Sequence, residues 1–416
     1  MAMLTTAARI WLLRSFQSFR FSNEFDKVLD YQNVPSLGLY VHIPFCRQIC
    51  TFCPYCKQLF DKETADRYVD VLLQEIHLVG ANQQRKNVTS LYFGGGSPAL
   101  MIDDIARIIK ELQKHFDILD GIGIELHPED VTIEKLQKLK AAGITRISIG
   151  IQSFDKSILQ KLGRRESHHS KVLAAVQAVP FDTVAMDFII ALEGQSFQSV
   201  CADIDTAFAS GANHIALYPF IDFAFAQSGV KKMTKKEMKK LLYRISDYCQ
   251  SQGYVRDSIW TFGKPGVDKY SSMTRDNYLG FGCSATTLLP GQFKINSFSV
   301  KAYIDRINSG TLPTALTIKF FLRQRMVYWL FWRLYTTRLN RQDFQEVFDV
   351  PLEKVYGLEL ALGRLFGLVK KEGNYYRLTS RGVFYYHHFE GYYTYAYIDH
   401  MWNVLKNEPL PKTLVL

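Results

Sequence analysis

Short apolar runs alternate with longer amphipathic segments between about residue 37 and residue 300. The runs are rich in β-branched residues and end in turn residues or polar motifs, as the strands of parallel sheets do. The segments between them carry apolar residues at three- and four-residue spacing, which predicts helices. Six strands are predicted: "GLYVHIPF", "VTSLYFGGG", "GIGIELHP", "TRISIGIQSF", "TVAMDFIIAL" and "HIALYPF". This alternation predicts an α/β fold with a full or partial barrel of six or more parallel units, whose active site lies at the carboxyl ends of the strands.

The strand–helix alternation stops after about residue 312. The segment "IKFFLRQRMVYWLFWRLYTT" has the pattern of a buried helix, and "FDVPLEKVYGLELALGRLFGLVKKEGNYYRLTS" predicts two helices and a pair of short strands. This order is typical of a winged helix, a fold that often binds nucleic acid. Its basic residues are interleaved with glutamate, so we expect it to pack on the barrel and to bind no nucleic acid. The predicted domains are an N-terminal helical extension (1–36), the barrel (37–311) and a smaller, mainly helical, winged-helix-like domain (312–416).

Charge adds information about partners and location. Lys plus Arg outnumber Asp plus Glu by 50 to 40, a formal net charge of +10 that favours anionic partners. No apolar run reaches the length of about 18 residues that a membrane span needs, so we expect none. The first 23 residues contain three arginines and no acid, as in an organelle presequence or an interfacial helix. We expect instead an amphipathic helix packed on the domain, in a cytoplasmic protein.

Four of the seven cysteines lie within eleven residues, "CRQICTFCPYC", directly after the first predicted strand. An odd number of cysteines, with the other three far apart, does not make a disulfide framework. A structural zinc site usually pairs two C-x-x-C motifs that lie a dozen or more residues apart. Thiolates crowded on one loop suit an iron–sulfur cubane. Three or four of them could be ligands, and if Cys56 points away, one iron stays open to a substrate or cofactor.

The spacing C-x-x-x-C-x-x-C at the end of a first barrel strand resembles the signature of the radical S-adenosylmethionine (SAM) superfamily. The resemblance implies that the barrel is a partial (β/α)6 barrel. The resemblance implies that Cys46, Cys50 and Cys53 hold a [4Fe–4S] cluster whose fourth iron binds the amino and carboxylate groups of SAM. One electron from the reduced cluster would then split the sulfonium and give a 5′-deoxyadenosyl radical. The run "YFGGGSP" on the second strand, which in isolation would suit any tight turn, resembles the family's motif for the SAM amino group: Gly94, Gly95, Gly96 and Ser97.

More narrowly, the chain resembles the oxygen-independent coproporphyrinogen III oxidase (HemN) family and its HemW-like haem chaperone relatives. The matching motifs are "LYVHIPFC", "GGGSP", "IELHPED", "RISIGIQSFD", "MDFIIALEGQS" and "YLGFGCSA". The resemblance implies that Tyr40 lies near the sulfonium, that Phe52 offers a backbone contact beside the cluster and that Glu125 binds a ribose. It also places five residues in the SAM pocket or in a second pocket beside it: Gln152, Arg164, Asp187, Pro219 and Thr286. The catalytic candidates are Tyr40, Glu125 and Asp187.

Each of these residues also has a purely structural interpretation. Glu125 could be an exposed residue of an alternating strand, and Arg164 a solvated charge at a helix end. Asp187 lies in the apolar run "VAMDFIIAL", where an unpaired carboxylate is costly, so we favour a functional role. His387 and His388 could bind metal or haem, but the aromatic residues around them favour a core or a substrate wall.

The resemblance leaves three functions open. The first is oxidative decarboxylation of propionates on an anionic tetrapyrrole, with one SAM and an electron donor such as flavodoxin or ferredoxin. The second is methyl transfer or haem modification with two SAM molecules, and the third is haem delivery or electron carriage without turnover. The chaperones have an H-N-x-x-Y-W stretch where this chain has "TRDNYLGFG", and the oxidase has its fourth cysteine one residue earlier. We favour the first function, in a monomer.

Overall fold

Six parallel strands form the predicted barrel in the computed structural model, which describes residues 2–24, 29–164, 168–226, 228–267 and 276–416. They follow one another in the sheet in the order β11-β10-β9-β8-β6-β2, and each overlaps one of the predicted apolar runs. Their bounds are β2 Leu37–Ile43, β6 Leu91–Gly95, β8 Ile122–Leu126, β9 Arg146–Gln152, β10 Thr183–Ile190 and β11 His214–Pro219. The prediction of an α/β fold with a partial (β/α)6 barrel is confirmed.

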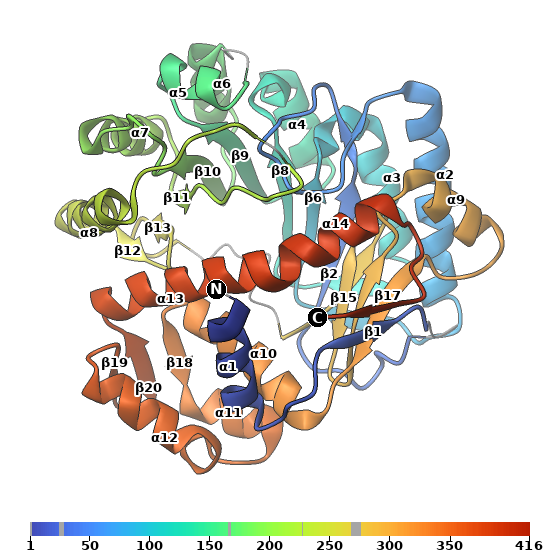
Figure 1. Cartoon of the computed structure of the whole chain (residues 1–416). Coiled ribbons are helices and arrows are strands. Elements are labelled where there is room, and N and C mark those ends of the chain that lie inside the picture. The colour runs from blue at the N-terminus through green and yellow to red at the C-terminus, as the bar shows by residue number, and fades with distance from the viewer. Residues whose placement is uncertain (1, 25–28, 165–167, 227, 268–275) are drawn as a thin grey trace.

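Helices cover the outer face of these strands (Figure 1). In α3, Ile105, Ile108, Ile109 and Leu112 are buried, the spacing by which one helix face meets a sheet. Side-chain caps fix where several of these helices begin, as where Asp61 accepts the Thr64 N–H at the start of α2. The helices are α2 Lys62–Gly80, α3 Ile102–Leu112, α4 Ile133–Ala141, α5 Lys156–Lys161, α6 His169–Ala178, α7 Phe197–Ala209, α8 Lys235–Ser251 and α9 Val300–Asn308. Two short 3-10 helices, η1 Pro98–Met101 and η2 Pro128–Asp130, follow β6 and β8.

The sheet extends beyond the six strands at both edges and stays open. Strand β14 pairs parallel with β2, and the strands beyond it, in the order β15-β16-β17-β1-β21, run antiparallel. At the other edge, β13 and β12 add to β11. Their bounds are β1 Arg20–Ser22, β12 Val255–Arg256, β13 Thr261–Gly263, β14 Asn277–Phe281, β15 Thr286–Leu289, β16 Gln292–Asn296, β17 Thr314–Lys319 and β21 Thr413–Val415. Both ends of the chain therefore join one edge. The domain boundaries stay a prediction. The predicted boundary between residues 311 and 312 is followed directly by β17, which belongs to the same sheet as the barrel strands.

The C-terminal region has the winged-helix arrangement expected from its sequence. Strand β18 precedes two helices, and it then pairs with β20 of the β19–β20 hairpin. Trp329, Phe344 and Tyr356 fill the core between these elements. Their bounds are α10 Leu322–Tyr335, β18 Arg338–Asn340, α11 Arg341–Phe348, α12 Leu352–Leu365, β19 Val369–Glu372 and β20 Tyr375–Leu378.

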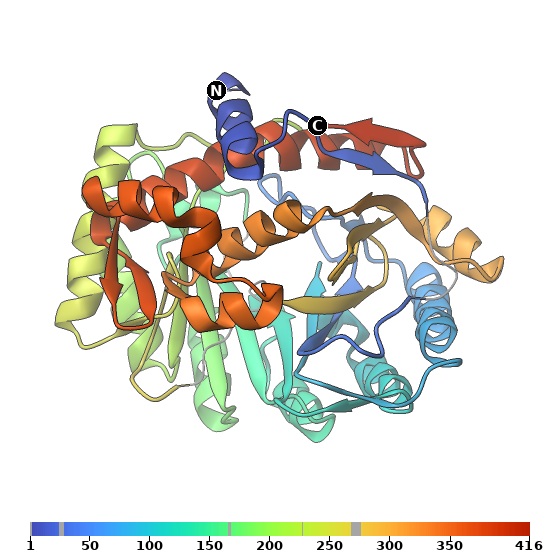
Figure 2. The same ribbon diagram turned by 90° about the horizontal axis from the view of Figure 1, so that it is seen from below.

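A long helical segment follows and runs across the barrel (Figure 1). It consists of α13 Ser380–Tyr393, the π-helix η3 Thr394–Ile398 and α14 Asp399–Asn407. The N-terminal helix α1 (Ala2–Leu13) lies on the outside of the C-terminal helices (Figure 2). Arg323 of α10 donates to the Leu12 carbonyl at 2.8 Å, and Arg14 pairs with Glu359 of α12 at 2.6 Å. Among the described residues, no helix is long and apolar enough to cross a membrane.

A buried carboxyl group ties α2 to the turn after β14. Glu75 is 2% exposed and accepts hydrogen bonds from the Gly282 N–H at 2.7 Å, the Tyr303 hydroxyl at 2.7 Å and the Asn296 amide at 3.2 Å. Burial raises the pKa of Glu75 from 4.5 to about 7, although these three hydrogen bonds favour the charged form. The group therefore links α2 to three segments that lie more than 200 residues later in the chain.

Glu75→Gln is expected to lower the free energy of unfolding by about 1–3 kcal/mol, because its amide cannot accept from all three donors. The folded carboxyl of the wild type keeps its proton to about pH 7, whereas the unfolded one ionises near 4.5. Between these pH values the folded state binds more protons, so the free energy of unfolding falls as pH rises. Glu75→Gln has no carboxyl group here, so its free energy of unfolding should decrease less between these pH values. Urea unfolding of both proteins at about pH 5 and about pH 8 measures the two decreases. Equal decreases would contradict the raised pKa of Glu75.

Candidate active site

The cysteine loop lies directly after β2 and is closed by a short strand pair, β3 (Phe45–Cys46) with β4 (Gln58–Leu59). Lys57 holds the loop from inside, because its ammonium donates to the carbonyls of Cys50 at 2.8 Å and Cys53 at 2.5 Å. Burial, together with the neighbouring Cys53 and Cys50, raises the pKa of the Cys46 thiol to about 12. The ionised form of Cys46 therefore needs a cationic partner.

Cys56 belongs to a different environment. Its sulfur donates to the Phe298 carbonyl at 3.1 Å and lies 3.6 Å from the sulfur of Cys283. Cys56 is 7% exposed, whereas each of the other three loop cysteines is half-buried. The fourth cysteine therefore faces Cys283 and Phe298 and leaves three thiols on the loop.

The three thiols are spaced too widely for a single ion. Zinc holds thiolates at about 2.3 Å, which brings tetrahedral ligand atoms to about 3.8 Å from one another. Of the described residues, no set of three ligand atoms within 4.8 Å of one another includes these cysteines. Wider spacing of three thiolates fits a polynuclear iron–sulfur cluster with one iron left without a protein ligand. The donor set thus fits the predicted [4Fe–4S] group.

The glycine run at the end of β6 lies against this loop. The Gly96 N–H donates to the Ile43 carbonyl and the Ser97 N–H to the Phe45 carbonyl, both at 2.7 Å. A Cβ on Gly96 would lie 2.8 Å from the Cys46 sulfur, and one on Gly94 would lie 2.9 Å from the Tyr40 hydroxyl. Side chains are thus excluded here, so that the backbone lies beside the first cysteine.

Tyr40 and His42 lie two residues apart on β2 and share one face of the strand. The Tyr40 hydroxyl lies 3.0 Å from Nδ1 of His42, and Nε2 of His42 lies 3.2 Å from the Cys56 carbonyl. Because a carbonyl only accepts, Nε2 carries the proton and Nδ1 accepts from Tyr40. Burial lowers the pKa of His42 to about 4, so the ring is neutral. His42 therefore fixes the direction of the Tyr40 hydroxyl.

Glu125 of β8 lies on the far side of Gly94. Its carboxyl group accepts from the Tyr92 hydroxyl at 3.1 Å and from the Gly95 N–H at 3.2 Å. The pKa of Glu125 is raised from 4.5 to about 8, because burial and the nearby Asp187 raise it more than the Gly95 N–H lowers it. The carboxyl group therefore holds a proton that can be released near neutral pH.

The next strands bring the remaining predicted side chains together. Asp187 of β10 accepts from the Ser148 hydroxyl at 2.8 Å, and burial raises its pKa to about 6. Arg164 donates to the Gly150 carbonyl at 2.9 Å, and its guanidinium lies 5.7 Å from the centre of the Phe52 ring. Gln152, at the end of β9, has a left-handed φ of 69°. Arg164 thus joins the cysteine loop to the end of β9.

The last two predicted residues flank this group. Pro219 ends β11, five strands from β2 on one side, and Thr286 begins β15, two strands away on the other. The Thr286 hydroxyl lies 3.0 Å from the Tyr278 hydroxyl. The roles assigned to all these residues stay predictions, but their positions place them around the carboxyl ends of the strands.

Comparison with known proteins bears on this arrangement. Residues 40–207 match the family model described as the radical SAM superfamily. The chain contains a radical SAM domain. It is 26% identical to the heme chaperone HemW of Bacillus subtilis over 82% of this chain and 95% of that protein. It is 25% identical to the oxygen-independent coproporphyrinogen III oxidase of Synechocystis, over 85% of this chain and 83% of that protein.

A solved structure shares the fold. The coproporphyrinogen III oxidase HemN of Escherichia coli superposes with a TM-score of 0.77 at 22% identity, over 91% of this chain and 97% of that one. The predicted HemN-like and HemW-like resemblance is confirmed by these matches. A radical SAM domain implies a [4Fe–4S] cluster and SAM, in agreement with the three thiols on the cysteine loop.

Helix α14 covers the radical SAM domain at the cysteine loop. The ring of Tyr55, between Cys53 and Cys56, lies 5.7 Å from Trp402 of α14. Trp402 also stacks on Phe223, which follows β11, at 5.8 Å. Lys406, one turn further, carries its charge close to Cys53 and Lys57. The C-terminal helix thus supplies part of the wall above the cluster loop.

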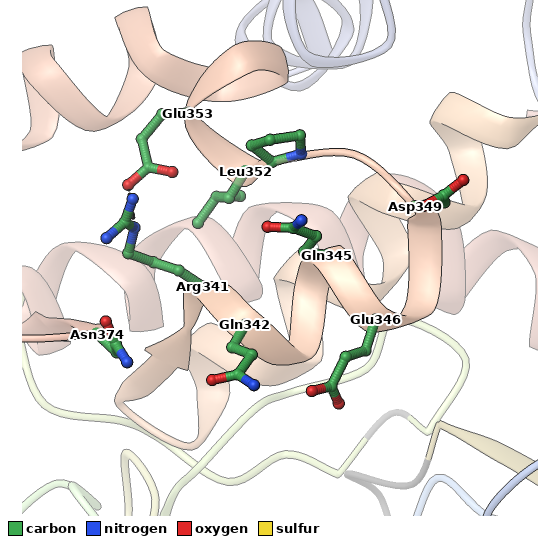
Figure 3. Close-up of a pocket in the computed structure, with 9 residues that line it drawn as sticks. Arg341, Gln342, Gln345, Glu346, Asp349, Leu352, Glu353 and Asn374 are labelled. Carbon is green, nitrogen blue, oxygen red and sulfur yellow. Dashed lines mark ion pairs between the residues drawn. The ribbon is translucent and has the colours of Figure 1, made fainter.

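A separate pocket of about 560 Å³ lies in the winged-helix region (Figure 3). Polar side chains from α11 and the start of α12 line it, and Arg341 pairs with Glu353 across it. It contains none of the predicted site residues. This pocket is therefore separate from the predicted SAM site.

Proposed function

We propose that the protein is a radical SAM enzyme that cleaves SAM reductively at a [4Fe–4S] cluster held by Cys46, Cys50 and Cys53. We propose a tetrapyrrole as its substrate and oxidative decarboxylation of a propionate as its reaction, as in oxygen-independent coproporphyrinogen III oxidase. The observation that carries the proposal is the orientation of Cys56, whose sulfur binds the Phe298 carbonyl and leaves three thiols on the loop. An electron donor such as flavodoxin or ferredoxin would reduce the cluster.

The bound cluster and SAM would supply a 5′-deoxyadenosyl radical able to take a hydrogen atom from the propionate β-carbon, and an external one-electron acceptor would take the electron released with CO2 when the vinyl group forms. The chain's own residues bind and orient. The backbone at Gly94–Gly96 would receive the SAM amino group, and Glu125 would accept from the ribose. Tyr40, held by His42, would lie beside the sulfonium. Asp187 would line the same pocket.

Charge and relatives support an anionic tetrapyrrole. Lys406 places an ammonium group beside the cysteine loop, where substrate carboxylates would enter. Tyr55 and Trp402 offer aromatic faces at the same place. Relatives named for coproporphyrinogen oxidation and for haem handling both align with most of this chain.

SAM affinity is expected to rise severalfold between about pH 6.5 and about pH 8.5. The carboxylate of Glu125 is a better acceptor than the neutral carboxyl group and attracts the sulfonium, and its pKa is about 8 in the protein. Ionisation therefore favours binding as pH increases. Equilibrium dialysis of labelled SAM with the cluster-loaded protein measures this. Glu125→Gln should bind more weakly and without this rise, and a rise of equal size in the variant would assign the titration to another group.

The substrate is tested by anoxic incubation of the reduced, cluster-loaded protein with SAM and coproporphyrinogen III. Mass spectrometry should show loss of CO2 and two hydrogens per propionate, with one 5′-deoxyadenosine formed each time. The Cys53→Ala variant is the control for cluster-dependent turnover. Formation of 5′-deoxyadenosine with unaltered coproporphyrinogen would reject this substrate and keep the SAM chemistry.

Haem delivery is a second candidate function. It is favoured by the match to the HemW chaperone of Bacillus subtilis over 95% of that protein. The stretch "TRDNYLGFG", which lacks the histidine and tryptophan of the chaperone motif, begins outside the described residues, at Thr274 and Arg275, and continues into β14. Tight, stoichiometric haem binding with no modified tetrapyrrole among the products would support this candidate over the oxidase.

A further inference from the structure

Three potential metal ligands meet on the outside of the barrel, away from the cysteine loop. They are His77 in the last turn of α2, Glu111 in the last turn of α3, and His115 in the connection to β7 (Phe116–Ile118). One ligand atom from each lies within 4.8 Å of the other two. Helices α2 and α3 pack side by side (Figure 1), which brings the two helix ends together.

His115 carries an unsatisfied polar atom at this place. Its Nε2 is buried and has no hydrogen-bond partner in the described part of the chain. The ring packs flat against Gly80, where an added Cβ would lie 2.5 Å from Nδ1. A buried imidazole nitrogen without a partner is costly, and a bound cation would satisfy it. Close packing against Gly80 also restricts the ring to this orientation.

The electrostatic surroundings favour a cation. The carboxyl ends of two helices present partial negative charge, and both His77 and Glu111 lie in such last turns. Glu111 binds Lys114 through Oε2 at 2.5 Å, and its second oxygen can serve as a ligand. Imidazole nitrogens and one carboxylate form a ligand set typical of zinc and neighbouring transition metals.

We propose that His77, Glu111 and His115 bind a divalent transition-metal ion, with zinc as the best fit and water completing its coordination. Both helix ends lie at the amino ends of the barrel strands, since α2 and α3 lead into β6 and β8. The cysteine loop lies at the opposite, carboxyl ends. The ion would therefore act as a structural link between α2 and the α3–β7 connection, independent of the SAM chemistry.

The test uses the full-length, cluster-loaded protein under anoxic conditions, so that the loop thiols are already occupied. Equilibrium dialysis against zinc chloride, with metal analysis by mass spectrometry, should find one zinc ion per chain in addition to the cluster iron. His77→Gln and Glu111→Gln should each weaken this binding at least tenfold. Zinc should raise the midpoint of thermal unfolding of the wild type by a few degrees and leave that of both variants unchanged. His77 is exposed, so its variant should fold normally without metal.

Two controls separate this site from other ligands. His400→Gln removes an exposed histidine of α14 and should bind zinc as the wild type does. The triple variant Cys46→Ser, Cys50→Ser, Cys53→Ser should keep this zinc ion although it loses the cluster. Zinc affinity that is unchanged in both His77→Gln and Glu111→Gln, or lost only in the triple cysteine variant, would overturn the proposal.

Discussion

Replacing Cys46, Cys50 or Cys53 by alanine is expected to abolish formation of 5′-deoxyadenosine from SAM. Each removes one of three thiolates that lie too far apart to bind a single ion and that Lys57 holds on one loop. With two thiolates left, the cluster would lack one protein ligand and would no longer be held beside the glycine run. Anaerobic reconstitution followed by iron and sulfide analysis, and then SAM cleavage with dithionite, measures both effects. We expect a loss of more than about a hundredfold, since covalent ligands of a cofactor are removed.

Cys56→Ala is the matched control for this series. Its sulfur makes its contacts with Phe298 and Cys283 and faces away from the loop. The variant should therefore keep its iron content and its SAM cleavage, with a small loss of stability from the buried cavity. Loss of the cluster in Cys56→Ala as complete as in Cys46→Ala would mean that four thiolates bind it, and no iron would then be open to SAM.

Gly96→Ala is expected to lower cluster content and SAM cleavage about as strongly as removal of a ligand. The new Cβ would lie 2.8 Å from the Cys46 sulfur and closer still to the Phe45 carbonyl. The backbone cannot move away at low cost, because the N–H groups of Gly96 and Ser97 hold it to the segment before Cys46 at 2.7 Å each. We therefore expect the strain to displace Cys46, one of the three proposed cluster ligands.

Gly291→Ala provides the control for Gly96→Ala. Gly291 lies in the turn between β15 and β16, where an added Cβ meets nothing within 4 Å. Iron content and circular dichroism of both variants separate loss of the cluster from loss of the fold. We expect normal helix content in both and a full cluster in Gly291→Ala alone. A full cluster with normal SAM cleavage in Gly96→Ala would contradict the proposed contact between the glycine run and the cluster ligand.

The strand–helix pattern could predict the barrel because each unit is local. A buried strand and its amphipathic helix carry their signal within some thirty consecutive residues, as "GIGIELHP" and the segment after it do. The open sheet with its antiparallel edge could not be predicted in the same way. Strand β1, only three residues long, pairs with β17 and β21 almost 300 and 400 residues later, and such short segments have no periodicity of their own.

The site was predictable where a motif fixes both residue type and spacing. The cysteine loop, the glycine run and Glu125 lie at successive strand ends, and the fold brings them together. Three further residues were missed. Lys57 could have been noticed as a cation next to four thiols, and His42 as a polar residue on the same face of β2 as Tyr40. Trp402 could not have been predicted from the sequence, since only the tertiary packing of α14 brings it to Tyr55.

The most direct measurement is electron paramagnetic resonance of the anoxic, iron-loaded, dithionite-reduced protein before and after SAM is added. If one iron of the cluster lacks a protein thiolate, SAM binds to it, and the signal of the reduced cluster changes in shape and position. The same change should occur in Cys56→Ala, whose sulfur faces Phe298. A spectrum that SAM leaves unaltered in both proteins would show that no iron is open to it, and the proposed chemistry would be wrong.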